Sequence, residues 1–232
     1  MPAPAIDISN LFFAWPGHSP LLHIQSLQMQ AGERLFLQGP SGSGKSTLLG
    51  LIAGVLTPTS GQLNILGEDM TALSSAKRDH LRAARLGVIF QIFNLVPYLS
   101  VIENITLPLN FSRTRANALT RPAPEEARRL LTRLGLEDEN LLRRRVSDLS
   151  VGQQQRVAAA RALIGSPDLI IADEPTSALD AETRDNFISL LTEEASRTDA
   201  ALLFVSHDPA LAIHFDRALN LAELNTVEVL RT

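Results

Sequence analysis

The chain of 232 residues contains no cysteine. Structural disulfides and thiolate metal sites are therefore excluded. A long apolar run is also missing, because stretches such as 169–172 are far shorter than the roughly 18–20 residues that a membrane-spanning helix needs. Residues 1–10 show no basic segment followed by an apolar one, so we expect no secretory signal.

Aromatic residues (5%) and lysines are scarce as well, and the only two lysines are Lys45 and Lys77. The net charge of −4 argues against a protein that coats nucleic acid, and we expect no nucleic-acid partner. With 45% hydrophobic and 20% charged residues, the composition is that of a folded globular chain of one domain or two closely joined ones.

Apolar patterning predicts an α/β fold. Short or alternating apolar runs predict strands at 6–15, 21–29, 34–37, 62–66, 86–90, 169–172 and 202–205. Helical spacing follows residue 47 and recurs at 74–84, 101–109, 125–134, 152–164 and 181–197. Buried strands interrupted by a run of helices indicate a parallel sheet with a helical insertion. We expect 113–124 to be a mobile linker.

A glycine-rich loop between a predicted strand and a predicted helix fits the pattern G-x-x-x-x-G-K-S. Its residues are Gly39, Pro40, Ser41, Gly42, Ser43, Gly44, Lys45 and Ser46, followed by Thr47. The glycines let backbone N–H groups curl around phosphate oxygens at the positive end of the helix. Lys45 would reach the β- and γ-phosphates, and the Ser46 hydroxyl is placed to bind Mg²⁺. The sequence therefore predicts a phosphate-binding loop.

Two adjacent carboxylates, Asp173 and Glu174, follow the apolar run 169–172. Alternation along a strand directs them differently, so they can divide the work. Asp173 would hold Mg²⁺ through water, and Glu174 would polarise the attacking water as a general base. Charged strand ends are common, so the acidic pair indicates a catalytic role only in combination with the phosphate-binding loop.

A third segment opens a predicted helix with Leu149, Ser150, Val151, Gly152 and Gln153. A Ser hydroxyl and free N–H groups at a helix N-terminus form an anion site. Taken alone, this segment is best explained as an ordinary N-cap.

In combination these motifs resemble an ATP-binding-cassette (ABC) ATPase over essentially the whole chain. Besides the loop and the acidic pair, the matching features are Gln91 after a strand, the Leu-Ser-x-Gly-Gln signature, Asp180, and His207 after a further strand. The resemblance implies a P-loop NTPase with a RecA-like core, an antiparallel β subdomain and an inserted α-helical subdomain. It implies one domain, 1–232, with 1–92 and 161–232 as the core and 93–160 as the helical signature subdomain.

The resemblance also implies a role for each matching residue in hydrolysing ATP to ADP and phosphate with Mg²⁺. Trp15 would stack on adenine, with Phe12 or Phe13 as the fallback. Gln91 would join Ser46 and Asp173 at Mg²⁺. His207 would contact the γ-phosphate, and Lys45 and Glu174 would complete the catalytic group. The resemblance implies that Ser150, Gly152 and Gln153 contact the nucleotide bound to a second subunit. It places Asp180 at the seam of an ATP-bound homodimer.

One departure is Val151, where the commoner signature has a glycine. The serine and the second glycine, which make the close phosphate contact, are retained. We expect ATPase activity to survive.

Residues 90–105 are similar to ATPases of the macrolide-exporter and lipoprotein-releasing (MacB/LolD-like) group. This similarity implies an ATPase at the cytoplasmic face of the inner membrane, powering export or extraction. Its partner would be a membrane permease subunit with few helices and a large extracytoplasmic domain. An importer ATPase and a cell-division-type signalling ATPase are the alternatives. Residues 93–110 would line the groove for a cytoplasmic helix of that partner, although the same residues suit a subdomain core. The basic run 143–145 reads as a solvated face.

Overall fold

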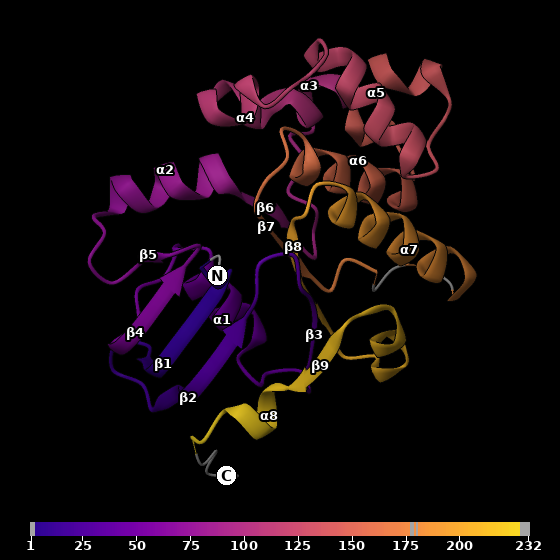
Figure 1. Ribbon diagram of the computed structural model, residues 1–232. Coiled ribbons are helices and arrows are strands. Elements are labelled where there is room, and N and C mark those ends of the chain that lie inside the picture. The colour runs from indigo at the N-terminus through magenta and orange to yellow at the C-terminus, as the bar shows by residue number, and fades with distance from the viewer. Residues whose placement is uncertain (1–2, 177–178, 180, 228–232) are drawn as a thin grey trace.

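The computed structural model describes residues 3–176, 179 and 181–227, and it places their strands in two sheets (Figure 1). The first is parallel, with the order β6 (Leu86–Ile89), β7 (Leu169–Asp173), β8 (Ala201–Ser206), β3 (Arg34–Gln38) and β9 (Arg217–Asn220). The second is antiparallel, with the order β2 (Pro20–Met29), β1 (Ile6–Ala14), β4 (Ser60–Ile65) and β5 (Glu68–Asp69). The predicted α/β class is confirmed.

Helices connect and cover these strands. The α-helices are α1 (Lys45–Ile52), α2 (Ser75–Arg85), α3 (Val101–Thr106), α4 (Arg113–Asn117), α5 (Ala123–Arg133), α6 (Val151–Leu163), α7 (Ala181–Arg197) and α8 (Leu221–Leu224). Further 3₁₀ helices cover Leu107–Asn110, Glu139–Arg143, Val146–Asp148 and Pro209–His214. Helices α3 to α6 lie together beyond one side of the parallel sheet, in the upper part of Figure 1. Within the described residues, no helix has the length and apolar character needed to cross a bilayer.

Alternation along the parallel strands divides the core into two hydrophobic clusters. Phe36, Ile170 and Phe204 pack on the side of α3, α5, α6 and α7. Their strand neighbours Leu37 and Ile171 pack on the opposite side, with α1 and the antiparallel sheet. Because the helical segment shares a cluster with the sheet, apolar burial joins the two parts directly.

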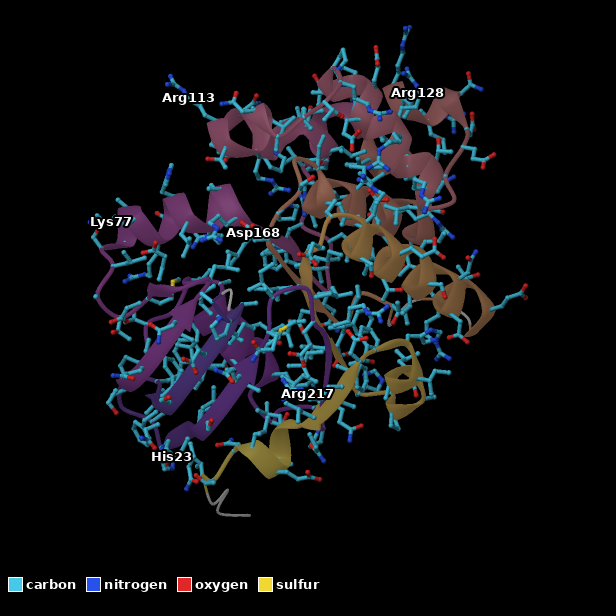
Figure 2. The ribbon with its side chains drawn as sticks, in the orientation of Figure 1. His23, Lys77, Arg113, Arg128, Asp168 and Arg217 are labelled. Atoms are coloured by element: carbon cyan, nitrogen blue, oxygen red, sulfur yellow. The ribbon has the colours of Figure 1, made fainter. Side chains whose placement is uncertain are left out.

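The expected linker 113–124 is wrong in its first residues, which form α4. Arg115 on this helix is 3% exposed, and its guanidinium donates hydrogen bonds to the carbonyls of Leu86, Ala162 and Ile164. Arg113, two residues earlier, points away from the fold (Figure 2). Burial lowers the pKa of Arg115 to about 10, and its main-chain partners explain how a charged residue anchors this segment.

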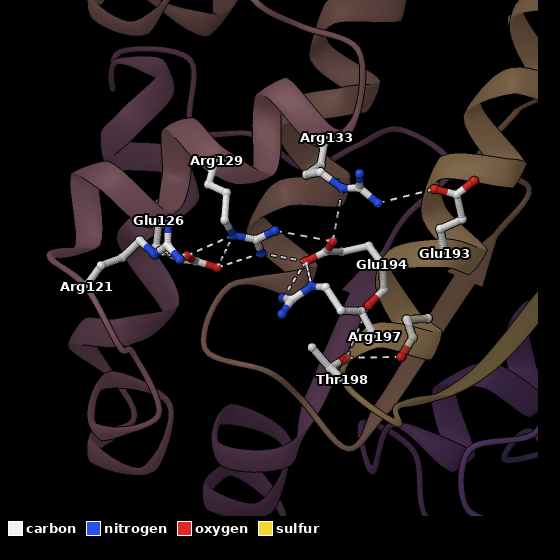
Figure 3. Close-up of polar contacts among 9 residues, drawn as sticks. Arg121, Glu126, Arg129, Arg133, Glu193, Glu194, Arg197 and Thr198 are labelled. Carbon is white, nitrogen blue, oxygen red and sulfur yellow. Dashed lines mark hydrogen bonds and ion pairs between the residues drawn. The ribbon is translucent and has the colours of Figure 1, made fainter.

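A cluster of ion pairs bridges α5 and α7 (Figure 3). At its centre the carboxylate of Glu194, 1% exposed, lies 2.5 Å from Arg129 and 2.7 Å from Arg197, with Arg133 at 3.8 Å. We call these four residues the arginine cluster. Burial alone would raise the pKa of Glu194, but hydrogen bonds and charges from Arg197 and Arg129 outweigh it and lower that pKa.

Candidate functional site

The glycine-rich loop joins β3 to α1 and ends at Gly44, the N-cap of α1. Gly44 has a φ of 96°, and a side-chain Cβ here would lie 2.8 Å from Leu22. Only glycine therefore suits this position. The first-turn N–H groups of α1 have no acceptor within the helix, which leaves them available to an anion.

Two polar groups of the loop are buried, the Lys45 ammonium and the Ser43 hydroxyl. The Lys45 ammonium donates to the carbonyls of Gly39 (2.7 Å) and Pro40 (2.9 Å) and lies 3.6 Å from a Glu174 carboxylate oxygen. The buried hydroxyl of Ser43 has no hydrogen-bond partner in the described part of the chain. A buried polar atom without a partner is costly, so the loop is shaped to receive a polar ligand.

At the carboxyl end of β7, Asp173 lies within reach of the loop. Its carboxylate accepts a hydrogen bond of 2.9 Å from the Ser46 hydroxyl. Burial, with a smaller contribution from the charge of Glu174, raises the pKa of Asp173 against the opposing hydrogen bond from Ser46. The surroundings of Asp173 in the folded protein therefore disfavour its ionised form.

Glu174 is held in an unusual conformation. Its φ of 43° is left-handed, which costs a non-glycine residue about 1–3 kcal/mol, and its N–H donates to the carbonyl of Val205 on β8 (2.9 Å). The carboxylate lies 2.9 Å from Nδ1 of His207. Strand β8 thus supplies both the backbone anchor of Glu174 and, just past its end, the imidazole beside it.

These groups line one open pocket of about 510 Å³, which we call the phosphate-loop pocket. It lies between the loop, the ends of β7 and β8, and β2, and its volume is in the range of small-molecule sites. Its lining residues are Leu21, Ser41, Gly42, Gly44, Lys45, Ser46, Thr47, Gln91, Asp173, Glu174 and His207. Sequence reasoning named all of these except Leu21, an apolar residue of β2 for which the sequence carries no distinguishing signal.

Gln91 begins a segment with two left-handed residues, Phe93 (φ 56°) and Asn94 (φ 48°). Their carbonyls accept hydrogen bonds of 2.6 and 2.7 Å from the guanidinium of Arg161 on α6. Arg161 was not identified from the sequence, because its partners lie far from it along the chain. The contact ties the segment after Gln91 to the helix that begins at the signature.

Trp15 does not line the phosphate-loop pocket. It follows β1, is 43% exposed, and forms a T-shaped ring contact with Phe13, with centroids 5.1 Å apart. Of the two fallback residues, Phe13 is only 5% exposed and belongs to the core, whereas Phe12 packs against His23. Among these three aromatics, Trp15 is the most exposed.

The signature residues also lie outside that pocket, at the start of α6. Ser150 caps the helix: its hydroxyl accepts from the Gln153 N–H, and the Gln153 side chain accepts from the Ser150 N–H. Val151, next in the chain, is 50% exposed although apolar. Gly152 follows in the first turn, and Asp180 lies outside the described residues.

The oxygen atoms around Ser46 and Asp173 fit Mg²⁺, a hard cation that prefers oxygen ligands. A hydroxyl and a carboxylate lie in contact there, and the Gln91 amide lines the same pocket. Across the described residues, no group of three His, Asp or Glu side chains could hold a metal unaided. Phosphate oxygens and water would therefore have to supply the remaining ligands.

Comparison with known proteins agrees with this geometry. Residues 22–177 match the family model of the ABC transporter. The lipoprotein-releasing system ATP-binding protein LolD of Anaeromyxobacter dehalogenans is 40% identical over 226 residues, covering 95% of this chain and 91% of that protein. The LolD protein of Pseudomonas fluorescens is 38% identical over 226 residues, covering 96% of each.

Among solved structures, the chain is similar to the ATP-binding cassette MJ0796. A dimer of that protein in a post-hydrolysis state, bound to ADP and Pi, aligns with a TM-score of 0.80 at 32% identity and covers 93% of each chain.

Proposed function

Because the chain belongs to the ABC transporter family and is one of its ATP-binding, ATP-hydrolysing subunits, we propose that it powers export or extraction through a separate membrane subunit. ATP would act by closing a dimer of this chain. The observation that carries the proposal is an incomplete site: the phosphate-loop pocket holds the loop, Asp173, Glu174 and His207, but no signature residue lines it. The signature of a second copy would complete it.

In this proposal the loop, the acidic residues, His207 and Trp15 have separate tasks. The loop from Gly39 to Thr47 would hold the phosphates, and Trp15 would stack on adenine. The Lys45 ammonium lies between two loop carbonyls and 3.6 Å from Glu174. Phosphates that enter the pocket would therefore compete with Glu174 for the positive charge of Lys45. Glu174 would then be free to take a proton from water, with His207 beside it.

Mg²⁺, when bound at Ser46, Gln91 and Asp173, would neutralise charge on the phosphates. Its binding would also offset the cost of ionising Asp173, whose pKa is raised in the folded protein. The Ser46 hydroxyl, which now donates to Asp173, would turn its oxygen toward the ion.

The signature side of the site would come from the second subunit. Ser150, Gly152 and Gln153 stand at the start of a helix of 13 residues, where N–H groups favour an anion. The exposed Val151 is the kind of apolar residue that a protein interface covers. Asp180 would lie at the dimer seam. The similar cassette MJ0796 is a dimer bound to ADP and Pi, which supports dimer formation by this chain.

We further propose that the membrane subunit contacts this chain beside the segment that follows Gln91. A second pocket, of about 390 Å³, is lined by Phe90, Asn94, Pro108 and Phe111 among others. Nearby, Ile92 and Tyr98 are 79% and 74% exposed. An apolar rim of this kind suits a short helix of a partner. In the proposed division into a core (1–92 and 161–232) and a signature subdomain (93–160), this groove would lie at their boundary, since residues of both line it.

LolD relatives are named for a lipoprotein-releasing system, which favours export or extraction of a lipid-linked or apolar substrate over import. The chain would then work as a peripheral subunit at the cytoplasmic face of the inner membrane. Its permease partner would have few helices and a large extracytoplasmic domain.

Dimer closure is tested by light scattering of Glu174→Gln, which should bind ATP without consuming it. With ATP and Mg²⁺ the mass should double from 25.2 kDa, whereas ADP should leave a monomer. A variant that stays monomeric while saturated with ATP would overturn the closure mechanism.

The transport role is tested by purifying the tagged chain from membranes of its native host in mild detergent. A co-purifying protein with about four membrane helices and a large extracytoplasmic domain, whose presence raises ATP hydrolysis, would support export or extraction. A multi-helix permease with a solute-binding protein would indicate an importer instead.

A further inference from the structure

The loop between β8 and the following 3₁₀ helix carries His207 into the phosphate-loop pocket, and several hydrogen bonds fix its neighbour Asp208. The Asp208 N–H donates to the hydroxyl of Ser206 (3.2 Å), and one carboxylate oxygen accepts from the Ala210 N–H (3.0 Å). The other carboxylate oxygen accepts a hydrogen bond of 2.7 Å from Arg184.

Arg184 reaches this loop from a different element. It lies in the first turn of α7, the helix that follows the β7 segment bearing Glu174. Its side chain is 22% exposed and that of Asp208 33%, so the pair is half-buried, and a charge-assisted hydrogen bond there is stronger than one in open water. The guanidinium also contacts Asp185 at 3.2 Å.

His207 itself has little packing to hold it, since its side chain is 61% exposed. Within the described part of the chain, its imidazole is held by the 2.9 Å hydrogen bond to Glu174. The position of the imidazole therefore depends on the backbone of its loop, and that backbone is held through Asp208.

We propose that Arg184 is a positioning residue for ATP hydrolysis: through Asp208 it fixes the loop that holds His207 against Glu174. Arg184 is not among the residues that line the phosphate-loop pocket, so its effect is on placement and not on the chemistry itself. The inference rests on the proposed role of His207 in hydrolysis.

The kinetic test compares Arg184→Ala, Arg184→Lys and Asp208→Asn. The alanine variant should lose roughly tenfold in kcat with little change in KM for ATP, because small misplacements of a catalytic group cost rate and not nucleotide binding. Lysine keeps the charge and one donor and should restore most of that rate. Asparagine keeps the oxygen that accepts from Ala210, and Asp208→Asn should lose about as much as Arg184→Ala.

The double variant Arg184→Ala, Asp208→Asn should be no slower than either single variant, since both remove the same interaction. Glu193→Gln is the matched control, because it removes an ion pair of α7 remote from the pocket and should leave kcat unchanged. Additive losses in the double variant would contradict the proposed path through Asp208.

A structural readout separates this inference from the role of His207. The chain has five histidines, so the imidazole signals of a histidine-labelled sample can be resolved by NMR, and His207→Gln identifies the one that belongs to His207. That signal should shift and broaden in Arg184→Ala but not in Glu193→Gln. Native kcat or an unchanged His207 signal in Arg184→Ala would overturn the inference itself, whereas native kcat in His207→Gln would overturn the role of His207 on which the inference rests.

Discussion

In the arginine cluster, the buried carboxylate of Glu194 accepts hydrogen bonds from Arg129 and Arg197, whereas in the phosphate-loop pocket Asp173 accepts one, from Ser46. The cations around Glu194 lower its pKa. Burial and the neighbouring Glu174 raise that of Asp173. Both carboxylates are largely shielded from water, yet the first stabilises the fold by being ionised and the second does not.

The opposite pKa shifts of Glu194 and Asp173 reflect the different roles of the two regions, because only the phosphate-loop pocket has a ligand to bind. The arginine cluster is complete, with three arginines around one acid and Glu126 bound to Arg129 on the same helix. The phosphate-loop pocket keeps a hydroxyl without a partner at Ser43 and a left-handed Glu174. Groups left unsatisfied or strained at a site are ready for a ligand, and the rest of the fold offsets their cost.

The largest effect in this comparison is expected from Glu174→Gln. Glutamine keeps the size of the side chain but cannot accept a proton, so ATP hydrolysis should fall roughly 100-fold or more. Phosphate release measured with saturating ATP and Mg²⁺ checks this, with Glu193→Gln as the control that should keep the native rate. A Glu174→Gln protein that hydrolyses ATP at near the native rate would remove Glu174 as the base.

Glu194→Gln should produce the opposite pattern, with stability lost and catalysis kept. It leaves three arginines without their central charge, and breaking a buried pair in this way costs about 3 kcal/mol. Denaturant unfolding at pH 7 measures the loss, and the rate per folded molecule should be unchanged. An equally stable variant would show that the cluster does not hold α5 to α7.

The same variant has a predicted pH dependence. Because the pKa of Glu194 is lowered in the folded state, its stabilisation is present above its ordinary value of 4.5 and is lost as the pH falls through the folded value. Native protein and Glu194→Gln should therefore differ most near neutral pH, and their stabilities should converge in acid.

Asp173→Asn should raise stability while abolishing hydrolysis. The raised pKa means that the folded state binds the proton of Asp173 more tightly than the unfolded state, so ionisation at neutral pH destabilises the fold. Asparagine removes that charge and can still accept from Ser46, and the gain should be about 1 kcal/mol at pH 7. The gain should disappear below the ordinary pKa of 3.8, where the native carboxylate is also neutral. A variant less stable than the native protein at pH 7 would show that the charge of Asp173 favours the fold.

The two regions also differ in how far the sequence reveals them. The loop around Lys45 and the acidic pair after β7 are local patterns, because a glycine-rich turn and a strand end place their groups without help from distant residues. Arg161 and Arg184 gave no such signal, since their partners lie 67 and 24 residues away and only the packed fold shows them.

Arg115 shows why the expected linker at 113–124 was wrong. A stretch rich in arginine and small residues reads as exposed, and arginine is rarely buried. Here three main-chain carbonyls, at the start of β6 and the end of α6, surround one guanidinium. That arrangement depends on where β6 begins and α6 ends in space, which no local pattern in 113–124 records.

The smallest effect is expected from Glu193→Gln. This variant compares an exposed ion pair with the buried ion pairs of the arginine cluster next to it. Glu193 is adjacent to Glu194 and also pairs with an arginine, Arg133, at 3.2 Å. Its side chain is 57% exposed and that of Arg133 48%, however, so water screens the pair and replaces its hydrogen bonds. The free energy of unfolding should change by less than about 0.5 kcal/mol, measured in the same denaturant titrations as Glu194→Gln. Two neighbouring glutamates, both bound to arginine, would then differ severalfold in their contribution because one is buried and one is not. A loss as large as that of Glu194→Gln would mean that the cluster extends to the surface and that Arg133 is held by Glu193 and not by Glu194.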